Sequence, residues 1–191
     1  MKKIKDFDKV YKYYDKFMAM FNLYKHEEIK SAANIDEHDI VVDIGGGTGK
    51  LAKYICNSCK TVYVLDESEQ MLSMVNQGKN LVCIRANALK TPFEDNSIDI
   101  VILSDVFHHI KEQKDLIVEI NRILKYGGKI VMMDFNRKHI KTKLLRAFEF
   151  TLFGRLFFKT KDEVRGLLEE CFYIQRFYDK GYYFIFVGEK R

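Results

Sequence analysis

A glycine-rich turn that directly follows an apolar run constrains this chain more than any other feature. The run is Val41-Val42-Asp43-Ile44, and it leads into Gly45-Gly46-Gly47-Thr48-Gly49. A short β-branched run of this kind predicts a buried parallel strand. The glycines allow a tight turn in which a ligand can lie against bare main chain. Because the next residues, Lys50 to Ile55, have a helical pattern, the sequence predicts a strand–turn–helix unit that binds a small molecule.

A second apolar strand, predicted over residues 61–65, ends in an acid. Asp66 follows this strand directly, and Glu67 stands beside it. A carboxylate at this place in such a sheet accepts hydrogen bonds from the hydroxyls of a ribose. The turn, the helix, the strand and the acid together predict a pocket for a ligand that contains adenosine.

Three kinds of adenosine ligand compete for this pocket. A phosphate-binding loop requires glycine, four residues and then Gly-Lys-Ser/Thr, but Ile44 and Leu51 occupy the first and last of these positions. A dinucleotide fingerprint requires its third glycine where Lys50 stands, so a nicotinamide cofactor is the weaker alternative. Asp43 favours S-adenosylmethionine, because a carboxylate beside the turn suits its free amino group and would repel a pyrophosphate.

With these motifs in place, the chain resembles the class I S-adenosylmethionine-dependent methyltransferases, and within them the ubiquinone and menaquinone C-methyltransferases. The resemblance covers residues 40–135 well and the N-terminus loosely. The matching segments, in chain order, are Val41–Gly49, Asp66, Arg85–Ala88, Thr91–Val101 and Arg122–Ile130. The chain departs from the family's pattern at Asn87, where Asp is frequent, at Ile98, where Phe is usual, and at Tyr126, where Pro is common.

The resemblance implies which residues hold the cofactor. Asp43 and the glycine turn face its methionine end, Asp66 binds the ribose, and Asn87 and Met71 lie at the adenine. Tyr14 matches a tyrosine that closes over the cofactor from an N-terminal helix; without the family, the same helix has an aromatic face that packs on a core. The full predicted set is Tyr14, Asp43, Gly45, Gly46, Gly47, Thr48, Gly49, Asp66, Glu67, Met71, Asn87, Ala88, Ser104 and Asp105.

Two neighbouring histidines are the candidates for acid–base chemistry. Methyl transfer is an in-line displacement in which the protein aligns the nucleophile and excludes water. An acceptor that must lose a proton is helped by a base. His108 and His109 follow the strand predicted at 98–103, and an imidazole titrates near neutrality. Local packing of the pair is the favoured alternative, because proximity to the cofactor is not catalytic geometry.

Strand and helix patterns alternate along the chain, which predicts a parallel sheet covered on both faces. A late hairpin around Asp179-Lys180-Gly181 matches the ending of the family, where the last strand inserts beside strand five. We therefore predict an α/β fold: a Rossmann-like, doubly wound, seven-stranded, mostly parallel sheet with an antiparallel last strand. One domain is expected over 1–191. Its parts are a helical lid (1–35), a cofactor-binding core (36–135) and a basic amphipathic segment, helix and terminal β-hairpin (136–191). The predicted strands are 40–44, 61–65, 81–85, 98–103 and 129–134, and the predicted helices are 5–30, 49–57, 68–77 and 112–124.

Composition narrows the remaining classes. The 191 residues are 47% hydrophobic, which suits one domain with an ample core. No apolar run reaches the ~20 residues of a membrane-spanning helix, so a cytoplasmic protein is expected. Cys56 and Cys59 form a Cys-x-x-Cys pair, but it has no second pair and stands at the end of a helix rather than at its start. We therefore expect reduced thiols and no metal.

The segment 137–161 is unusually basic, with eight lysines and arginines against one acid, Glu149. Apolar residues recur in it at intervals of four: Ile140, Leu144, Phe148, Leu152 and Leu156. The favoured interpretation is a helix that packs this stripe on the sheet and leaves its lysines in solvent. A peripheral contact with an anionic membrane, which would admit a lipid-like substrate, is second. Binding of nucleic acid is third, because a net charge of +5 is modest.

We therefore predict a methyltransferase that uses S-adenosylmethionine, with S-adenosylhomocysteine as product, and acts on a small, apolar or aromatic acceptor. A quinone-like ring is favoured. The alternatives are an NAD(P)-dependent oxidoreductase and a non-catalytic protein that binds an adenosyl ligand. The sequence leaves the oligomeric state open.

Overall fold

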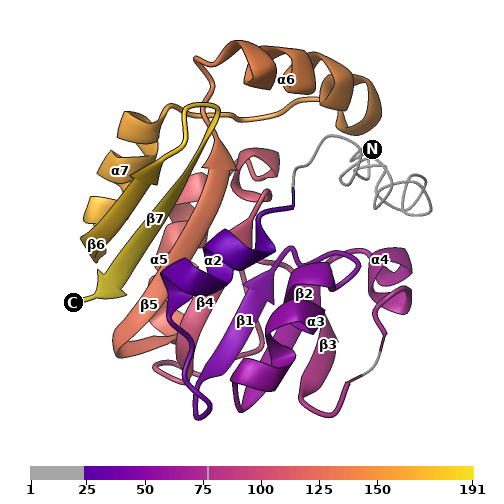
Figure 1. Ribbon diagram of the computed structural model, residues 1–191, viewed down its shortest axis with the longest axis vertical. Coiled ribbons are helices and arrows are strands. Elements are labelled where there is room, and N and C mark those ends of the chain that lie inside the picture. The colour runs from indigo at the N-terminus through magenta and orange to yellow at the C-terminus, as the bar shows by residue number, and fades with distance from the viewer. Residues whose placement is uncertain (1–23, 77) are drawn as a thin grey trace.

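The computed structural model describes residues 24–76 and 78–191, arranged around one central sheet (Figure 1). The elements in chain order are α2 (His26–Ala33), β1 (Ile40–Ile44), α3 (Lys50–Ile55), η1 (Cys56–Ser58), β2 (Thr61–Asp66), α4 (Glu69–Ser73), β3 (Leu81–Arg85), β4 (Ile98–Ser104), η2 (Phe107–His109), α5 (Gln113–Ile123), β5 (Leu124–Phe135), α6 (Ile140–Phe153), α7 (Lys161–Glu169), β6 (Phe172–Asp179) and β7 (Tyr183–Lys190).

The sheet has seven strands in the order β3-β2-β1-β4-β5-β7-β6. Strands β1 to β5 pair in parallel with their neighbours. Strand β7 is antiparallel to both β5 and β6. The predicted fold is therefore confirmed, including the last strand that inserts beside β5. Because β1, β2 and β4 end at the same edge, the glycine turn, Asp66 and Ser104 lie along one side of the sheet.

Helices cover both faces of the sheet. Helices α2 and α3 pack on one face through Ile29, Leu51 and Ile55, and all three side chains are buried. Helix α5 and helix α7 pack on the other face, where Leu116 and Leu168 are completely buried. Figure 1 shows α6 apart from both layers, lying across the end of the sheet toward which β5 points. The carboxyl edge of the central strands is thus the edge that α6 adjoins.

Two predicted helices differ from the observed ones. Most of the helix predicted at 5–30 lies outside the described residues; α2 begins only at His26 and continues to Ala33, where Asn34 in left-handed conformation ends it. The helix predicted at 68–77 ends at Ser73, although Ser68 caps its start as expected, because its hydroxyl accepts from the Met71 amide at 3.1 Å. The chain leaves this helix early and brings Val75 against Gly49 of the glycine turn.

Strand β5 is longer than predicted, starting at Leu124 rather than at residue 129. Leu124 pairs with Ile98 of β4, and the register then shifts before Lys129 pairs with Ile100. Gly127, with φ +74°, absorbs this irregularity. The glycine pair Gly127-Gly128 therefore lies in an irregular part of the strand, where the register with β4 shifts.

The predicted packing stripe of the basic segment is wrong for its first two residues, although its last residue, Leu156, is buried in the core. Ile140 and Leu144 are 64% and 68% exposed, so they point away from the sheet. Among the side chains of α6 that the structure describes, the buried ones are Thr142 and Glu149, and Leu145 is partly buried. The reason is the position of α6, which caps polar strand ends rather than covering an apolar sheet face. Within the described residues, no helix has the length and apolar content needed to cross a bilayer.

Candidate functional site

The glycine turn between β1 and α3 has a backbone that other residues rarely adopt. Gly45, Gly47 and Gly49 have φ values of +71°, +54° and +71°. The Gly45 amide donates to the Leu65 carbonyl of β2 at 2.7 Å. A Cβ on Gly45 would lie 2.2 Å from Val106 Cγ2, in the loop after β4. The turn is therefore clamped between two neighbouring strand ends, and only glycine fits at its first position.

Asp43, at the end of β1, is the acid beneath this turn. Its side chain is buried, and within the described residues its Oδ2 has no hydrogen-bond partner. A Cβ on Gly46 would come within 2.8 Å of that oxygen. Burial, with a smaller contribution from the nearby Asp66, raises the pKa of Asp43 to about 7. A buried acceptor without a donor, next to bare main chain, is the kind of atom that a cationic ligand group satisfies.

Asp66, at the end of β2, is held in a fixed orientation. Its Oδ2 accepts from the Gly47 amide at 3.0 Å, and its Oδ1 accepts from the Ser68 amide at 2.8 Å. Burial raises the pKa of Asp66, although these two amide bonds act in the opposite direction. Each oxygen keeps a second lone pair for a further donor. The neighbouring Glu67 is exposed.

A narrow cavity of about 40 Å³ opens over the turn. Among the predicted cofactor residues, it is lined by Asp43, Gly45, Gly46, Gly47, Thr48 and Ser104. Sequence reasoning missed four further lining residues, which are Tyr24, His26, Lys50 and Leu51. The Tyr24 and His26 rings are tilted against each other, with centroids 4.8 Å apart. Nothing in the sequence indicated this contact. Lys50 had one, because it directly follows the turn. Burial, and then the charge of Lys50, lowers the pKa of His26.

Other predicted cofactor residues lie near this cavity without lining it. Met71 is buried in the first turn of α4. Asn87 is exposed and its Oδ1 already accepts from the Leu89 amide at 2.7 Å, which leaves one lone pair for an adenine amino group. Ala88 is partly buried against the core. Tyr14 lies outside the described residues.

The histidines predicted as bases sit in a buried polar cluster, which we define as Asp105, His108, His109, Asp134 and Glu149. All five residues are buried, and each is at most 6% exposed. His108 lies at the centre: its Nδ1 is 2.7 Å from Asp134 Oδ1, and its Nε2 is 3.4 Å from Glu149 Oε2. The ring of His108 also stacks on Phe158, with centroids 4.0 Å apart. The structure thus brings Asp105, His108 and His109 together, and adds two acids that sequence reasoning missed.

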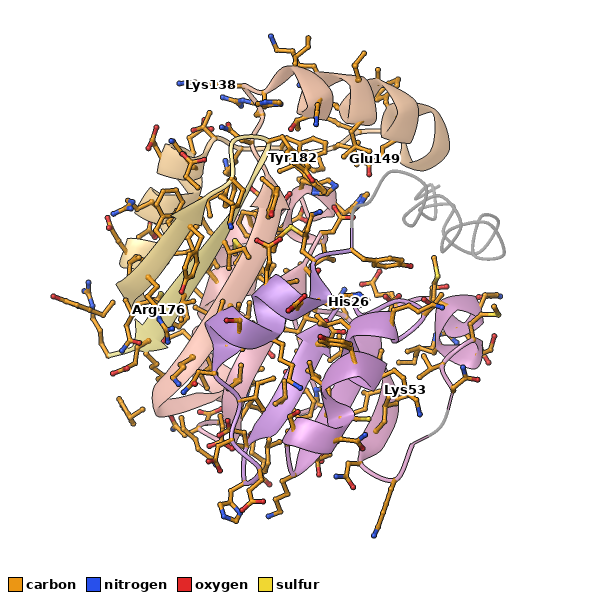
Figure 2. The ribbon with its side chains drawn as sticks, viewed as in Figure 1. His26, Lys53, Lys138, Glu149, Arg176 and Tyr182 are labelled. Carbon is orange, nitrogen blue, oxygen red and sulfur yellow. The ribbon has the colours of Figure 1, made fainter. Side chains whose placement is uncertain are left out.

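Both missed acids had a weak signal in the sequence. Asp134 stands near the carboxyl end of a predicted strand, as Asp43 and Asp66 do. Glu149 is the single acid of the basic segment. Figure 2 shows Glu149 on the side of α6 that faces the strands. Burial lowers the pKa of His108, but the neighbouring Asp134 and Glu149 outweigh this effect and hold it well above its usual value. Burial raises the pKa of Asp105. A role of either histidine as a base stays a prediction.

A second cavity, of about 340 Å³, lies between α6 and the start of α5. Five cationic residues line it, Lys111, Arg137, Arg146, Arg155 and Lys159, together with Phe150 and Phe157. The exposed Phe150 stands at this cavity on α6. The cationic wall is therefore adjacent to the exposed apolar residues of the same helix.

Comparison with known proteins agrees with this geometry. The family described as a methyltransferase domain matches residues 42–132. A demethylmenaquinone methyltransferase from Geobacillus sp. is 29% identical over 184 residues, covering 86% of this chain and 78% of that protein. A ubiquinone/menaquinone biosynthesis C-methyltransferase from Pseudomonas fluorescens is 28% identical, covering 68% of this chain and 56% of that protein.

Solved structures show the same fold at lower identity. A methyltransferase from Haloferax volcanii, solved in complex with the Trm112 methyltransferase activator, has a TM-score of 0.85 at 17% identity, covering 98% of each chain. An S-adenosylmethionine-dependent methyltransferase from Thermotoga maritima has a TM-score of 0.80 at 17% identity, covering 97% of this chain and 98% of that one.

Proposed function

Because this chain carries a methyltransferase domain of the class I S-adenosylmethionine-dependent type, we propose that it methylates a small apolar or aromatic acceptor, with a quinone-like ring favoured. The observation that carries the proposal is Asp43, a buried carboxylate whose Oδ2 has no hydrogen-bond partner among the described residues, beside a turn of bare main chain. The demethylmenaquinone methyltransferases to which the chain is similar support the choice of ring.

In this proposal the cofactor supplies an electrophilic methyl group, and the chain holds and orients it. Asp43 accepts from the amino group of the methionine end, and Gly45 to Thr48 present main chain to it. Asp66 accepts from the ribose hydroxyls through the lone pairs that its amide partners leave open. Met71 and Asn87, with Ala88, border the adenine. Tyr14, Gly49, Glu67, Ser104 and Asp105 complete the proposed set.

The cavity over the turn is smaller than such a ligand. At about 40 Å³ it accepts only a few atoms, so binding requires the lining side chains to move. Lys50, Tyr24 and His26 are the lining residues with long or aromatic side chains at its margin. We propose that they shift when the cofactor enters and then exclude water from the sulfonium.

The same proposal treats the chain as one domain. Residues 36–135 form the cofactor-binding core, and within 136–191 it is α6 that covers the acceptor side. A nicotinamide-dependent oxidoreductase is disfavoured, because Lys50 occupies the third glycine position of a dinucleotide turn and Asp43 would repel a pyrophosphate.

The test combines binding with turnover. Calorimetric titration with S-adenosylhomocysteine and, separately, with NADH identifies the ligand class. Transfer of a labelled methyl group from S-adenosylmethionine to a reduced demethylated naphthoquinone, with a simple phenol for comparison, identifies the acceptor class. Binding of NADH alone would replace the proposal with an oxidoreductase. Tight binding of S-adenosylhomocysteine without turnover on any ring would favour the non-catalytic alternative.

A second proposal, supported by a different observation, is that 137–161 contacts an anionic membrane surface. The exposed apolar residues Ile140, Leu144 and Phe150 share α6 with several lysines and arginines. The cationic cavity that Phe150 lines offers donors to a phosphate-bearing headgroup. This combination suits a helix that lies in the interface and brings an apolar acceptor to the sheet edge.

Vesicle co-sedimentation tests the membrane contact. Binding should rise with the fraction of anionic lipid and fall with added salt, because screening weakens the electrostatic part. The double variant Ile140→Ser, Leu144→Ser should lose binding, while Val118→Ser, which alters an exposed apolar residue on α5, should retain it. Sedimentation that ignores lipid charge would remove the proposal.

A further inference from the structure

The buried polar cluster beneath α6 carries more negative charge than its surroundings balance. It holds three carboxyl groups, Asp105, Asp134 and Glu149, all in residues no more than 6% exposed. Within the part of the chain that the structure describes, every ion pair of these acids is with His108. Buried charges are costly unless paired. The cluster therefore calls for a positive charge that the described residues supply only in part.

The orientation of His108 aims a ring nitrogen at the acids. Asp134 accepts from the His108 amide at 3.0 Å and from the Phe135 amide at 2.6 Å, and its Oδ1 also lies 2.7 Å from His108 Nδ1. Since a carboxylate only accepts, Nδ1 carries the proton and Nε2 is turned away from Asp134. Nε2 then faces Glu149 Oε2 at 3.4 Å and Asp105 Oδ1 at 3.9 Å.

These facing atoms do not satisfy one another. Among the described residues, His108 Nε2, Asp105 Oδ1 and Glu149 Oε2 each have no hydrogen-bond partner, although all three are buried. A charge-assisted hydrogen bond is about 2.7–2.9 Å long, clearly shorter than the 3.4 Å between Nε2 and Oε2. Three unpartnered polar atoms that converge on one point indicate an occupant at that point.

The spacing fits a metal ion better than a proton. Two ligands at about 2.0–2.1 Å from a tetrahedral zinc ion are about 3.4 Å apart, which is the observed separation of Nε2 and Oε2. One ligand atom each from His108, His109 and Glu149 lie within 4.8 Å of one another. A proton on His108 adds one positive charge to the cluster, whereas a divalent ion adds two.

We propose that His108, His109 and Glu149 bind a divalent transition-metal ion of the zinc type. Two imidazoles and one carboxylate are a ligand set that such ions accept. Asp105, whose backbone is held at φ +59°, lies close enough to Nε2 to complete the coordination. Asp134 positions His108 by fixing its tautomer, as carboxylates behind metal-binding histidines do.

This ion would fasten α6 to the sheet. Glu149 is the member of the set that belongs to α6, whereas His108 and His109 belong to η2, directly after β4. Coordination would thus hold the basic helix over the strand ends that carry Ser104 and the cofactor cavity. The inference does not depend on the identity of the methyl acceptor, because it concerns ion binding by the free protein.

The decisive experiment measures metal binding by the wild-type chain after removal of metals with a chelator. Titration with Co²⁺ and with Zn²⁺ should saturate near one ion per chain, and Co²⁺ should give visible absorption typical of nitrogen and oxygen ligands. The thermal midpoint should rise with metal concentration, because only the folded state presents the site. No saturable binding of either ion, with an unchanged midpoint, would overturn the proposal.

Variants assign the site. Glu149→Gln and His109→Ala should each weaken Co²⁺ binding at least about 10-fold, and Asp134→Asn about 10- to 100-fold. The matched control is His38→Ala, which removes an exposed histidine, and it should bind as the wild type does. The double variant Cys56→Ser, Cys59→Ser tests whether the thiol pair binds the ion instead. If this variant abolishes Co²⁺ binding while Glu149→Gln does not, the ion is bound by the thiols and the proposal fails. If the buried variants do not fold, the Co²⁺ spectrum of the wild type still separates imidazole ligands from thiolates.

Discussion

The glycine turn after β1 and the buried polar cluster after β4 lie at the same edge of one sheet, yet they are built in different ways. The turn presents main chain: three of its glycines have positive φ, and its hydrogen bonds run through main-chain groups to neighbouring main chain and to the Asp66 carboxylate. The cluster presents side chains that come from the loop after β4, from η2, from β5 and from α6. The turn is suited to an extended ligand that lies against the backbone, and the cluster to a compact positive charge.

The two regions also carry different costs for the fold. In the turn the cost is steric, because Val106 and Val75 pack where side chains of Gly45 and Gly49 would stand. In the cluster the cost is electrostatic, because carboxylates are buried near one another. Substitutions should therefore act through stability at the turn and through charge at the cluster. The predictions below test that difference, starting with the largest effect.

Within the turn, Gly45→Ala should give the largest loss of stability. The new Cβ would overlap Val106, at 2.2 Å from its Cγ2, in a backbone with φ +71°. Overpacking costs about 1–3 kcal/mol, and left-handed backbone adds about 1–2 kcal/mol for a residue with a Cβ. Urea unfolding should show a loss of about 3 kcal/mol, together with loss of cofactor binding.

Gly154→Ala is the matched control for strain without overlap. Its φ is +73° and no atom lies within 4 Å of the added Cβ. It should lose only the backbone component, about 1–2 kcal/mol. Equal losses at the two glycines would mean that the turn is not sterically clamped.

Among variants that leave the fold in place, Asp66→Ala should give the largest loss of cofactor affinity. Without the Asp66 carboxylate, the ribose hydroxyls lose their hydrogen-bond acceptor at a cost of about 1–3 kcal/mol. This loss weakens binding about 5- to 150-fold. Calorimetric titration with S-adenosylhomocysteine measures it. Asp39→Ala, which removes an acid just before β1, should bind normally. An unchanged affinity of Asp66→Ala would count against the ribose role.

The same contrast explains what the sequence could predict. The strands at 40–44 and 81–85 and the acid after β2 were predictable, because hydrophobic period and strand-end position are local patterns. The cofactor cavity was predictable in part, through Asp43 and the glycines. Its far wall, made by Tyr24 and His26, was not predictable, because no local pattern indicates which aromatic residues the fold brings to a strand end.

The polar cluster was beyond sequence reasoning for the same reason. His108 and Asp134 are 26 residues apart in the sequence. Glu149 lies on α6, where the side that faces the protein differs from the predicted one at Ile140 and Leu144. A repeat of apolar residues at intervals of four indicates an amphipathic helix, but it does not say which face meets the protein. Here the exposed face keeps Ile140 and Leu144, and the inner face carries an acid.

The pH dependence of cofactor binding tests the electrostatics of Asp43. Its pKa of about 7 in the folded protein lies above the ordinary 3.8. In the free protein the unfolded chain releases this proton near pH 4 and the folded chain keeps it to about pH 7, so stability falls as pH rises through that window. A cationic ligand group favours the ionised form, so affinity should fall by up to about tenfold per unit as pH drops below about 7.

Calorimetry in two buffers of different ionisation enthalpy measures the proton that Asp43 releases on binding. At about pH 6 the wild type should release protons to the buffer when S-adenosylhomocysteine binds. Asp43→Asn should bind with no such component, and its stability should decline less than that of the wild type between about pH 4 and about pH 7, because Asp66 and Asp105 keep their raised pKa values. The ligand's own amino group contributes equally to both proteins, so their difference isolates Asp43. Identical proton release by the two would contradict the pairing of Asp43 with the amino group.

The smallest stability effect is expected where α6 exposes its apolar residues. Leu144→Ser should change the free energy of unfolding by no more than about 0.5 kcal/mol, because the side chain is already 68% exposed. Leu168→Ala, in the fully buried face of α7, should cost about 2–5 kcal/mol. Urea unfolding of the two variants compares α6 with α7, two helices for which the apolar pattern in the sequence predicts the same kind of packing. A large loss of stability in Leu144→Ser would mean that α6 packs its apolar residues at intervals of four against the protein after all, and that Glu149 faces solvent. That outcome would remove the physical basis of both the membrane contact and the metal site.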